Sequence, residues 1–400
     1  MLLFEMKKIW KKPLNKAAFI ALAAIVAIAS FLTIRDIRYT DENGDSHSGI
    51  AAIGRLKEDK KEWEGPVTEE VLRRVLEENQ RVYKLIYAAE TIQEEDAAFS
   101  QTEGFSDIRD IINYGFGATG DYDYYRIDGV ALDQVGTLYE RRIANLRTYM
   151  DTEEHFTQPE REYLLNRYEE FQTPIEYEYF EGWRALVDSQ YLPTLMLILA
   201  LIAGILVSGI FSDEFIYKAD TVFFSSRLGR GRGTGAKLWA GFLTATIVYW
   251  AAIFIYAAVI LGIAGVEGGS LPIQMEHWYT MYNFNQVQTF AVTVLAGYVG
   301  TLFSSACAML ISAKTRSTVL AITVPFILTC VSPFVGRIPV LTRASSLFPD
   351  MLFRLNTEMN GFLLYRIGGN IFSQFSVILV MYLILTCVLF PLLYVLYRNS

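Results

Sequence analysis

The chain is poor in cysteine and histidine, with three of each in 400 residues. The cysteines all fall within long apolar runs, as Cys307, Cys330 and Cys387. Residues 35–190 therefore contain no cysteine, and a large outside domain without disulfides is more typical of bacteria than of secreted eukaryotic proteins. The histidines are scattered at His47, His155 and His277, so no clustered Cys/His metal site is predicted.

Charged residues are also scarce, at 20% of the chain, and none lies within the six longest apolar runs. A helix of about 20 residues covers a hydrocarbon core of about 30 Å, so each run is long enough to cross a bilayer. The predicted spans are 17–34, 191–211, 238–264, 289–313, 317–335 and 371–397. An ionisable group inside a membrane is costly and usually functional. Its absence argues against an ion-coupled transporter that powers itself.

The chain has no complete nucleotide-binding or hydrolase motif. Segment 229–237 lacks the Gly before its lysine and the Ser or Thr after it that a P-loop requires, which favours a flexible basic turn. Run 121–132 lacks the central Gly and final Glu of a calcium loop, which favours a solvated acidic loop. No G-x-S-x-G motif occurs, although distant residues can still meet in space. We expect no catalytic, cofactor or metal site on this chain.

The net charge of −8 conceals two unequal parts. Residues 35–190 carry 18 Lys/Arg and 35 Asp/Glu, whereas the remainder carries 17 and 8. An acidic domain is thus set into a basic, apolar frame. A phosphate backbone needs a basic surface, so nucleic-acid binding is excluded for the acidic part. Its charge either keeps the domain soluble or steers a cationic substrate or peptide.

The distribution of lysine and arginine in the short loops predicts the orientation of the spans. Basic residues cluster before the first run, in 212–237 and in 314–316, which share one side if six spans alternate; 265–288 has none. Loop 336–374, with four arginines, is the partial exception. We expect a bacterial plasma-membrane protein with both termini in the cytoplasm. Signal-peptide cleavage is disfavoured because 16 residues with five lysines precede the first run.

Apolar periodicity predicts a mostly helical (α or α+β) extracellular domain over 35–190. Helices are expected over 66–94, over 131–150 and onward from a capping box at Thr157–Glu160, with glycines 115, 117 and 120 interrupting the middle. Loop 336–374 is amphipathic, so short helices lying in or dipping into the outer leaflet are expected. The predicted fold class is a membrane all-α protein with six transmembrane helices. Its parts are 1–34 (interfacial helix and first span), 35–190 (acidic extracellular domain) and 191–400 (spans two to six, with the cytoplasmic loop 212–237 and the extracellular segment 336–374).

Segment 209–240 is the most informative part of the chain. An acidic residue follows the second span, then a small residue, an apolar run, a Ser-Arg turn and a lysine entering the third span: Glu214, Ala219, Ser226-Arg227 and Lys237. In this respect the sequence resembles the ABC-2 type permeases, the membrane subunits of bacterial ABC exporters. Ala219 departs from the glycine frequent in that family. The N-terminal Leu2–Lys12 looks like the family's membrane-surface helix, and the large insert after the first span leaves the substrate open.

The resemblance implies that loop 212–237 is a coupling loop that docks to a cytoplasmic ABC ATPase, which would hold ATP and Mg. The mixed charge and an aromatic pair at 223–224, expected to be exposed, suit such docking. Spacing allows Asp213, Glu214 and Lys218 to share one helical face. The predicted partner-binding residues are Asp213, Glu214, Lys218, Asp220, Ser226, Arg227, Arg230 and Lys237. Alternatively, the arginines are only topology signals and headgroup anchors.

The leading prediction is therefore the permease subunit of a bacterial ABC exporter, paired with a second permease, identical or related, and surrounded by membrane lipid. The uncharged spans favour an amphipathic cargo such as a lipid, an antimicrobial peptide or a drug. The alternative is a membrane-anchored receptor or sensor whose extracellular domain binds a peptide, toxin or phage component. An integral membrane enzyme with residues gathered from distant segments is a further alternative.

Overall fold

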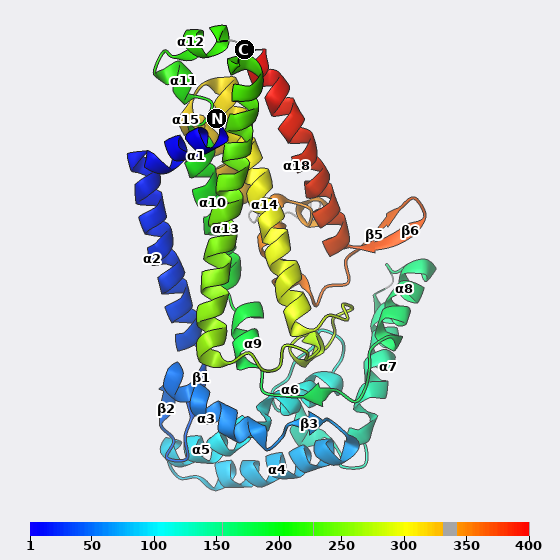
Figure 1. Cartoon of the computed structure of the whole chain (residues 1–400). Coiled ribbons are helices and arrows are strands. Elements are labelled where there is room, and N and C mark those ends of the chain that lie inside the picture. The colour runs from blue at the N-terminus through cyan, green and yellow to red at the C-terminus, as the bar shows by residue number, and fades with distance from the viewer. Residues whose placement is uncertain (154, 227, 331–341, 400) are drawn as a thin grey trace.

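The computed structural model describes residues 1–400 with the exception of 154, 227, 331–341 and 400. The chain is mostly helical, and the long apolar runs form its frame (Figure 1). Among the described residues, five helices are long and apolar enough to cross a membrane. They are α2 (Pro13–Arg35), α10 (Tyr191–Ser208), α13 (Thr234–Ala264), α14 (Gln286–Thr315) and α18 (Gln374–Arg398). Both chain termini lie at the same end of this bundle (Figure 1).

The predicted fifth span, 317–335, is described only in part. Its described portion is the shorter apolar helix α15 (Thr318–Cys330), and the rest lies outside the described residues. The last span begins three residues later than predicted, because residues Asn370–Ser373 form strand β6, which pairs with β5 (Leu364–Ile367) in a hairpin. Gly368 and Gly369 make its turn with positive φ angles of 59° and 91°, a backbone conformation that glycine adopts freely. The amphipathic pattern of 336–374 predicted short helices, so this hairpin corrects that expectation for 364–373.

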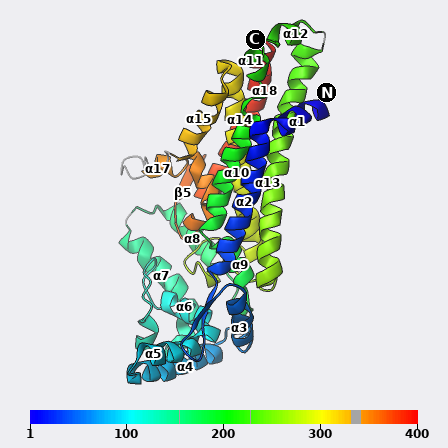
Figure 2. The same ribbon diagram turned by 90° about the vertical axis from the view of Figure 1, so that its left-hand side faces the viewer.

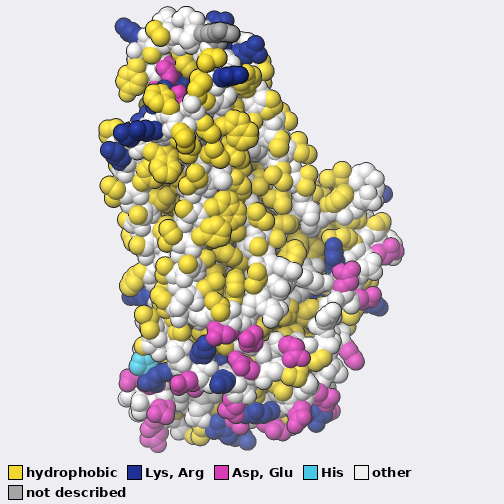
Figure 3. Space-filling view, in the orientation of Figure 1, with side chains coloured by type: hydrophobic (Ala, Val, Ile, Leu, Met, Phe, Trp, Pro, Cys, Tyr) yellow, Lys and Arg dark blue, Asp and Glu magenta, His cyan; other side chains and the backbone are white. Residues whose placement is uncertain are grey.

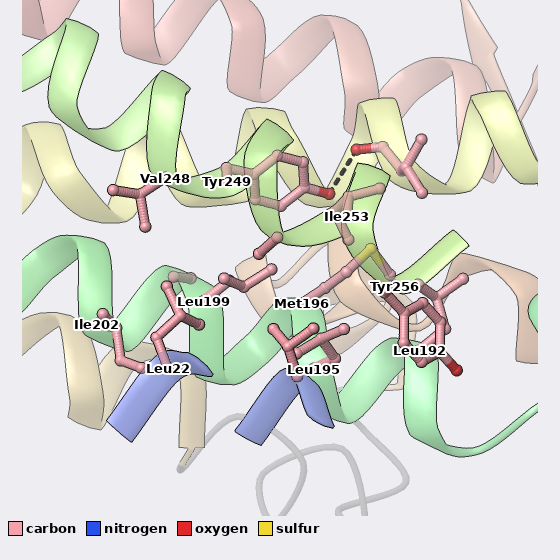
Figure 4. Packing of buried hydrophobic residues seen from close by; sticks show 14 of the residues in the cluster. Leu22, Leu192, Leu195, Met196, Leu199, Ile202, Val248, Tyr249, Ile253 and Tyr256 are labelled. Atoms are coloured by element: carbon pink, nitrogen blue, oxygen red, sulfur yellow. Dashed lines mark hydrogen bonds between the residues drawn. The ribbon is translucent and has the colours of Figure 1, made fainter. Parts of the chain in front are cut away.

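Helices α10 and α14 form the centre of the bundle. Within the apolar window of each, 67% of residues are buried, against 22% for α2 and α18. The central packing joins Leu195, Met196 and Leu199 of α10 to Tyr249 and Ile253 of α13 (Figure 4). The Tyr249 hydroxyl donates to the Val294 carbonyl of α14 at 2.6 Å, which gives this buried polar group a partner. The peripheral helices α2 and α18 present apolar side chains outward, as the broad hydrophobic surface in Figure 3 shows.

Residues 35–190, hereafter the polar domain, lie at the end of the bundle opposite the termini (Figures 1 and 2). Its helices are α3 (Ile50–Lys61), α4 (Glu69–Ala88), α5 (Ile92–Phe99), α6 (Ser106–Gly115), α7 (Leu138–Thr152), α8 (Gln158–Glu169) and α9 (Glu181–Val187). Two small antiparallel sheets pair β1 (Arg38–Thr40) with β2 (Ser46–Ser48) and β3 (Gly65–Pro66) with β4 (Glu176–Tyr177). Charged side chains of both signs crowd its surface in Figure 3.

The three helices predicted within 35–190 are present with adjusted bounds. Thr68 caps α4, whose N-terminal turn carries Glu69 and Glu70. The helix predicted over 131–150 starts later, because residues 135–137 form a 3₁₀ turn before α7 begins at Leu138. The capping box of Thr157 and Glu160 starts α8 as predicted. Helix α6 ends at Gly115, where the glycine-containing segment was expected to interrupt the domain.

The core of the polar domain also contains the loop between α13 and α14. Leu271, Met275, Trp278 and Tyr279 from this loop are buried among side chains of α4, α6 and β4. Arg142 of α7 is 2% exposed and fixes the same loop by donating to the Trp278 carbonyl at 3.0 Å and the Thr280 carbonyl at 2.8 Å. The polar domain is therefore bound to the bundle through a second segment, 265–285, as well as through its own two ends.

Several short elements lie outside the long helices. At the end that holds the termini these are α1 (Leu2–Lys11), α11 (Asp213–Ile216) and α12 (Asp220–Ser225). Before the β5–β6 hairpin lie α17 (Thr342–Ser345) and two 3₁₀ helices, Pro349–Phe353 and Leu355–Glu358. The first of these 3₁₀ helices packs against α14, α10 and α15, with Leu352 and Phe353 buried. This segment lies within the protein rather than on its surface, which suits irregular backbone beside apolar helices.

Candidate functional site

Seven of the eight predicted partner-binding residues lie in the loop between α10 and α13, and the eighth, Lys237, lies in the first turn of α13. The loop is not one continuous helix. Helix α11 ends at Ile216, and Lys218 adopts a positive φ of 55°. That left-handed residue turns the chain before α12 begins at Asp220. The expectation that Asp213, Glu214 and Lys218 share one helical face is therefore wrong: only the first two lie on α11.

A cluster of ion pairs, buried at Glu5 and Lys237 and exposed at Lys8, anchors the start of this loop. Lys237 of α13 is 1% exposed, and its Nζ donates to Glu214 Oε1 at 2.6 Å and to the Ile210 carbonyl at 3.0 Å. Lys8 of α1 reaches the same Glu214 oxygen at 3.3 Å and Glu5 at 3.1 Å, and Glu5 lies 3.4 Å from Lys237. We call Glu5, Lys8, Glu214 and Lys237 the anchor cluster. Two lysines and two glutamates compensate each other where α1, α11 and α13 meet.

The electrostatics of Glu214 follow from this arrangement. Burial alone would raise the pKa of its carboxyl, but the hydrogen bond and charge of Lys237, together with Lys8, outweigh burial and lower the pKa. Lys8 behaves in the opposite sense: burial works to lower its pKa, and Glu5 and Glu214 raise it. Both groups are thus held in their charged forms.

A second contact ties α1 and α2 to the loop. Lys12, between the two helices, forms an ion pair with Asp213. Asn15 of α2 is 2% exposed and donates to the carbonyls of Ile9, at 2.8 Å, and Leu206, at 3.1 Å. These bonds satisfy carbonyls at helix ends that would otherwise lack partners. A cavity of about 410 Å³ lies between α1 and the loop, bordered by Asp213, the anchor cluster and Tyr217.

The exposed apolar residues of the loop are not those that the sequence suggested. Phe223 and Phe224 are only partly exposed, because both pack against Tyr397 of α18, with ring centroids 5.9 and 5.3 Å away. Instead, Ile216 is 54% exposed, Tyr217 75% and Val222 72%. We call these three residues the apolar ridge.

Asp220, Ser226 and Arg230 lie in this loop without joining the anchor cluster. Asp220 begins α12 and forms no ion pair within the described residues. The Ser226 hydroxyl donates to the Phe223 carbonyl at 2.8 Å, and Arg230 lies over the Phe224 ring at 5.9 Å. Arg227 lies outside the described residues.

A second charged cluster joins the polar domain to the bundle, and sequence reasoning missed it entirely. Lys60 of α3 is 1% exposed and contacts Asp107, at 2.8 Å, and Glu181. Arg184 of α9 pairs with the same two carboxylates and with Glu276 at 3.2 Å. We call these five residues the junction cluster. No spacing rule reveals it, because its members come from segments that lie far apart in the chain, from Lys60 to Glu276.

Burial and the neighbouring cations have opposite effects on the carboxylates of the junction cluster, and the balance differs between Asp107 and Glu276. It would raise the pKa of Asp107, but Arg184 and Lys60 outweigh burial and hold that pKa low. At Glu276 burial prevails over Arg184 and raises the pKa from 4.5 to about 7. A cavity of about 450 Å³ opens beside the cluster, between the end of α2, α3 and α9. Its wall carries Asp36, Glu103 and Asp188 as well as Lys60, Glu181 and Arg184.

No group of His, Cys, Asp and Glu suited to a metal ion occurs among the residues that the structure describes. The chain is mostly helical, and several of its helices are long and apolar enough to cross a membrane. It is therefore compatible with a multi-pass membrane protein. Comparison with protein-family models finds no match, and neither a curated protein nor a solved structure matches the chain.

Proposed function

We propose that this chain is the permease subunit of a bacterial ABC exporter and that its α10–α13 loop docks to a cytoplasmic ATPase. The observation that carries the proposal is the division of that loop into two parts. The anchor cluster fixes its base to α1 and α13, while the apolar ridge is left exposed beyond it. Apolar side chains on a rigidly held base are suited to a groove on a soluble partner.

This division assigns different roles to the motif residues. Glu214 and Lys237 bind each other and α1, so they transmit displacement of the loop to the spanning helices. Tyr217 and Val222 supply the contact with the partner. The fully buried Lys237 has no surface to offer a partner, which supports a structural role for the family-like lysine.

A second permease completes the proposed assembly. Helices α2 and α18 bury only 22% of their apolar windows within this chain, so their outward faces are available to lipid or to another permease. The absence of charged residues from the apolar runs supports an amphipathic cargo driven by the partner's ATP hydrolysis.

The test is copurification. The tagged chain should be extracted from its native membrane in mild detergent, and the accompanying proteins identified by mass spectrometry. We expect a stoichiometric soluble ATPase that is lost from the double variant Tyr217→Ser, Val222→Ser. The matched control is Tyr87→Ser, which removes an equally exposed tyrosine (79%) from the polar domain and should retain the ATPase.

Two outcomes would reject the proposal. A clean preparation without any ATPase would favour the receptor alternative, with the polar domain as the place to seek a peptide ligand. An ATPase that stays bound to the ridge variant as firmly as to the control would mean that the loop does not form the interface.

A further inference from the structure

A long apolar groove runs between α2 and α13 on the outward side of the bundle. Figure 2 faces these two helices, which lie side by side. The groove has a volume of about 630 Å³ and is lined by Phe19, Ala23 and Ala27 of α2 and by Val248, Ala251 and Ile255 of α13, among others. Its wall on α2 extends from Phe19 to Ile34, which at 1.5 Å per residue is about 22 Å. One leaflet of a bilayer is about 15 Å thick in its hydrocarbon part, so a complete acyl chain fits along the groove.

Helix α1 closes the groove at the end where the chain begins. The Trp10 indole N–H donates to Thr244 Oγ1 of α13 at 3.3 Å, which holds α1 across the two helices. The Trp10 ring also packs against Phe19 of α2, with centroids 5.5 Å apart. Tryptophan at the edge of an apolar surface is typical of the boundary between headgroups and hydrocarbon.

The lysines at this mouth divide into two sets. Lys8 and Lys12 are occupied by Glu214 and Asp213. Lys7, Lys11 and Lys16 are exposed and form no ion pair with any described residue, and Lys11 borders the cavity between α1 and the α10–α13 loop. Lys7 lies three residues before Trp10 on α1, and Lys16 lies three residues before Phe19 on α2, so each is one turn from a groove-lining aromatic on the same face.

We propose that the groove binds an acyl chain of an anionic phospholipid from the leaflet on the N-terminal side, with its phosphate held by Lys7 and Lys16. The apolar wall fits the chain, and two uncompensated cations at the mouth fit the headgroup. A second copy of the protein fits less well. A two-fold axis along the membrane normal would bring the same lysines of both copies together, and like charges would repel. The site does not depend on the proposed exporter function.

The test uses the purified full-length chain and native mass spectrometry after addition of dioleoyl phosphatidylglycerol or dioleoyl phosphatidylcholine. We expect the wild-type chain to retain the anionic lipid. In the variant Lys7→Gln, Lys16→Gln, the fraction of protein carrying this lipid should fall about fivefold for each lysine removed. The matched control, Lys218→Gln, Lys314→Gln, removes two exposed lysines that form no ion pair with a described residue, one from the α10–α13 loop and one from the last turn of α14, and should retain the lipid.

A second pair of variants tests the groove itself. Ala23→Leu with Ala27→Leu fills the groove and should abolish retention, whereas Ala21→Leu with Ala24→Leu adds the same bulk to other exposed positions of α2 and should not. The proposal is overturned if the lysine variant or the filled variant binds as much anionic lipid as its control. It is also overturned if wild type is a dimer that the filling variant converts to a monomer, because a second copy would then occupy the groove.

Discussion

Lys237 is a buried cation, and its environment shows how a single residue fixes a surface loop. Its ammonium group has three oxygen partners from three segments: Glu214, Glu5 and the Ile210 carbonyl. A buried ion pair of this kind contributes little beyond a well-packed apolar substitute, but loss of one partner leaves an uncompensated charge. The loop is therefore more sensitive to changes at Glu214 than to changes at its exposed residues.

This reasoning leads to a prediction for Glu214→Gln. We expect it to lower the free energy of unfolding by about 3 kcal/mol, because Lys237 keeps its charge and loses its nearest carboxylate. Asp220 lies in the same loop but forms no ion pair with a described residue. We therefore expect Asp220→Asn to change the free energy of unfolding by less than about 0.5 kcal/mol. Thermal unfolding in detergent measures both. Equal stability of the two variants would show that the anchor cluster does not hold the loop.

At the scale of elements, the junction cluster connects α3, α6 and α9 to the loop before α14, and Glu276 makes this connection sensitive to pH. In the unfolded chain the Glu276 carboxyl loses its proton near pH 4.5, whereas in the folded protein it keeps the proton up to about pH 7. The folded state therefore binds an extra proton between these values, and the contribution of Glu276 to stability is lost as pH rises through this window.

We expect Glu276→Gln to remove this pH-dependent contribution. The hydrogen bond that Glu276 accepts from Gln286, at 3.1 Å, and the pair with Arg184 then no longer change with titration. As the pH rises from about 4.5 to about 7.5, the free energy of unfolding of the variant should increase relative to that of wild type by on the order of 2–3 kcal/mol. Melting curves across this range measure the difference. Glu70→Gln, exposed on α4, serves as the control, and a parallel pH profile for Glu276→Gln and Glu70→Gln would contradict the assignment.

Elements that depend on nearby residues were predictable, and those that depend on distant partners were not. Thr157 and Glu160 cap α8 through a bond of 2.8 Å that their own spacing creates. Trp278 is buried instead by residues from α6 and α7, more than 130 residues earlier, and its loop carries no periodic pattern. The same limit applies to the site. The motif named Glu214 and Lys237, but the pairing of Glu214 with Lys8 crosses 206 residues.

At the scale of the molecule, α10 connects the two charged clusters. It starts shortly after α9, which carries Glu181 and Arg184, and ends at Ser208, six residues before Glu214. A helix of 18 residues is about 27 Å long and is central in the bundle, with most of its apolar window buried. A displacement of the loop at one end therefore has a short, well-packed route to the polar domain at the other. This route is what the proposed exporter requires of its permease.

The proposed topology places the α10–α13 loop and the polar domain on opposite sides of the membrane, and single cysteines test it. In a background where Cys307, Cys330 and Cys387 are replaced by serine, Ile92→Cys and Tyr217→Cys introduce thiols at positions that are 78% and 75% exposed. A membrane-impermeant maleimide should label Ile92→Cys in intact cells and Tyr217→Cys only after permeabilisation, because the basic loops are expected to stay in the cytoplasm. Labelling of both thiols in intact cells would exclude docking to a cytoplasmic ATPase, since the apolar ridge would then face outward. Labelling of Tyr217→Cys alone in intact cells would mean that the chain has the opposite orientation. The polar domain would then lie in the cytoplasm, where its acidic surface would need a different partner.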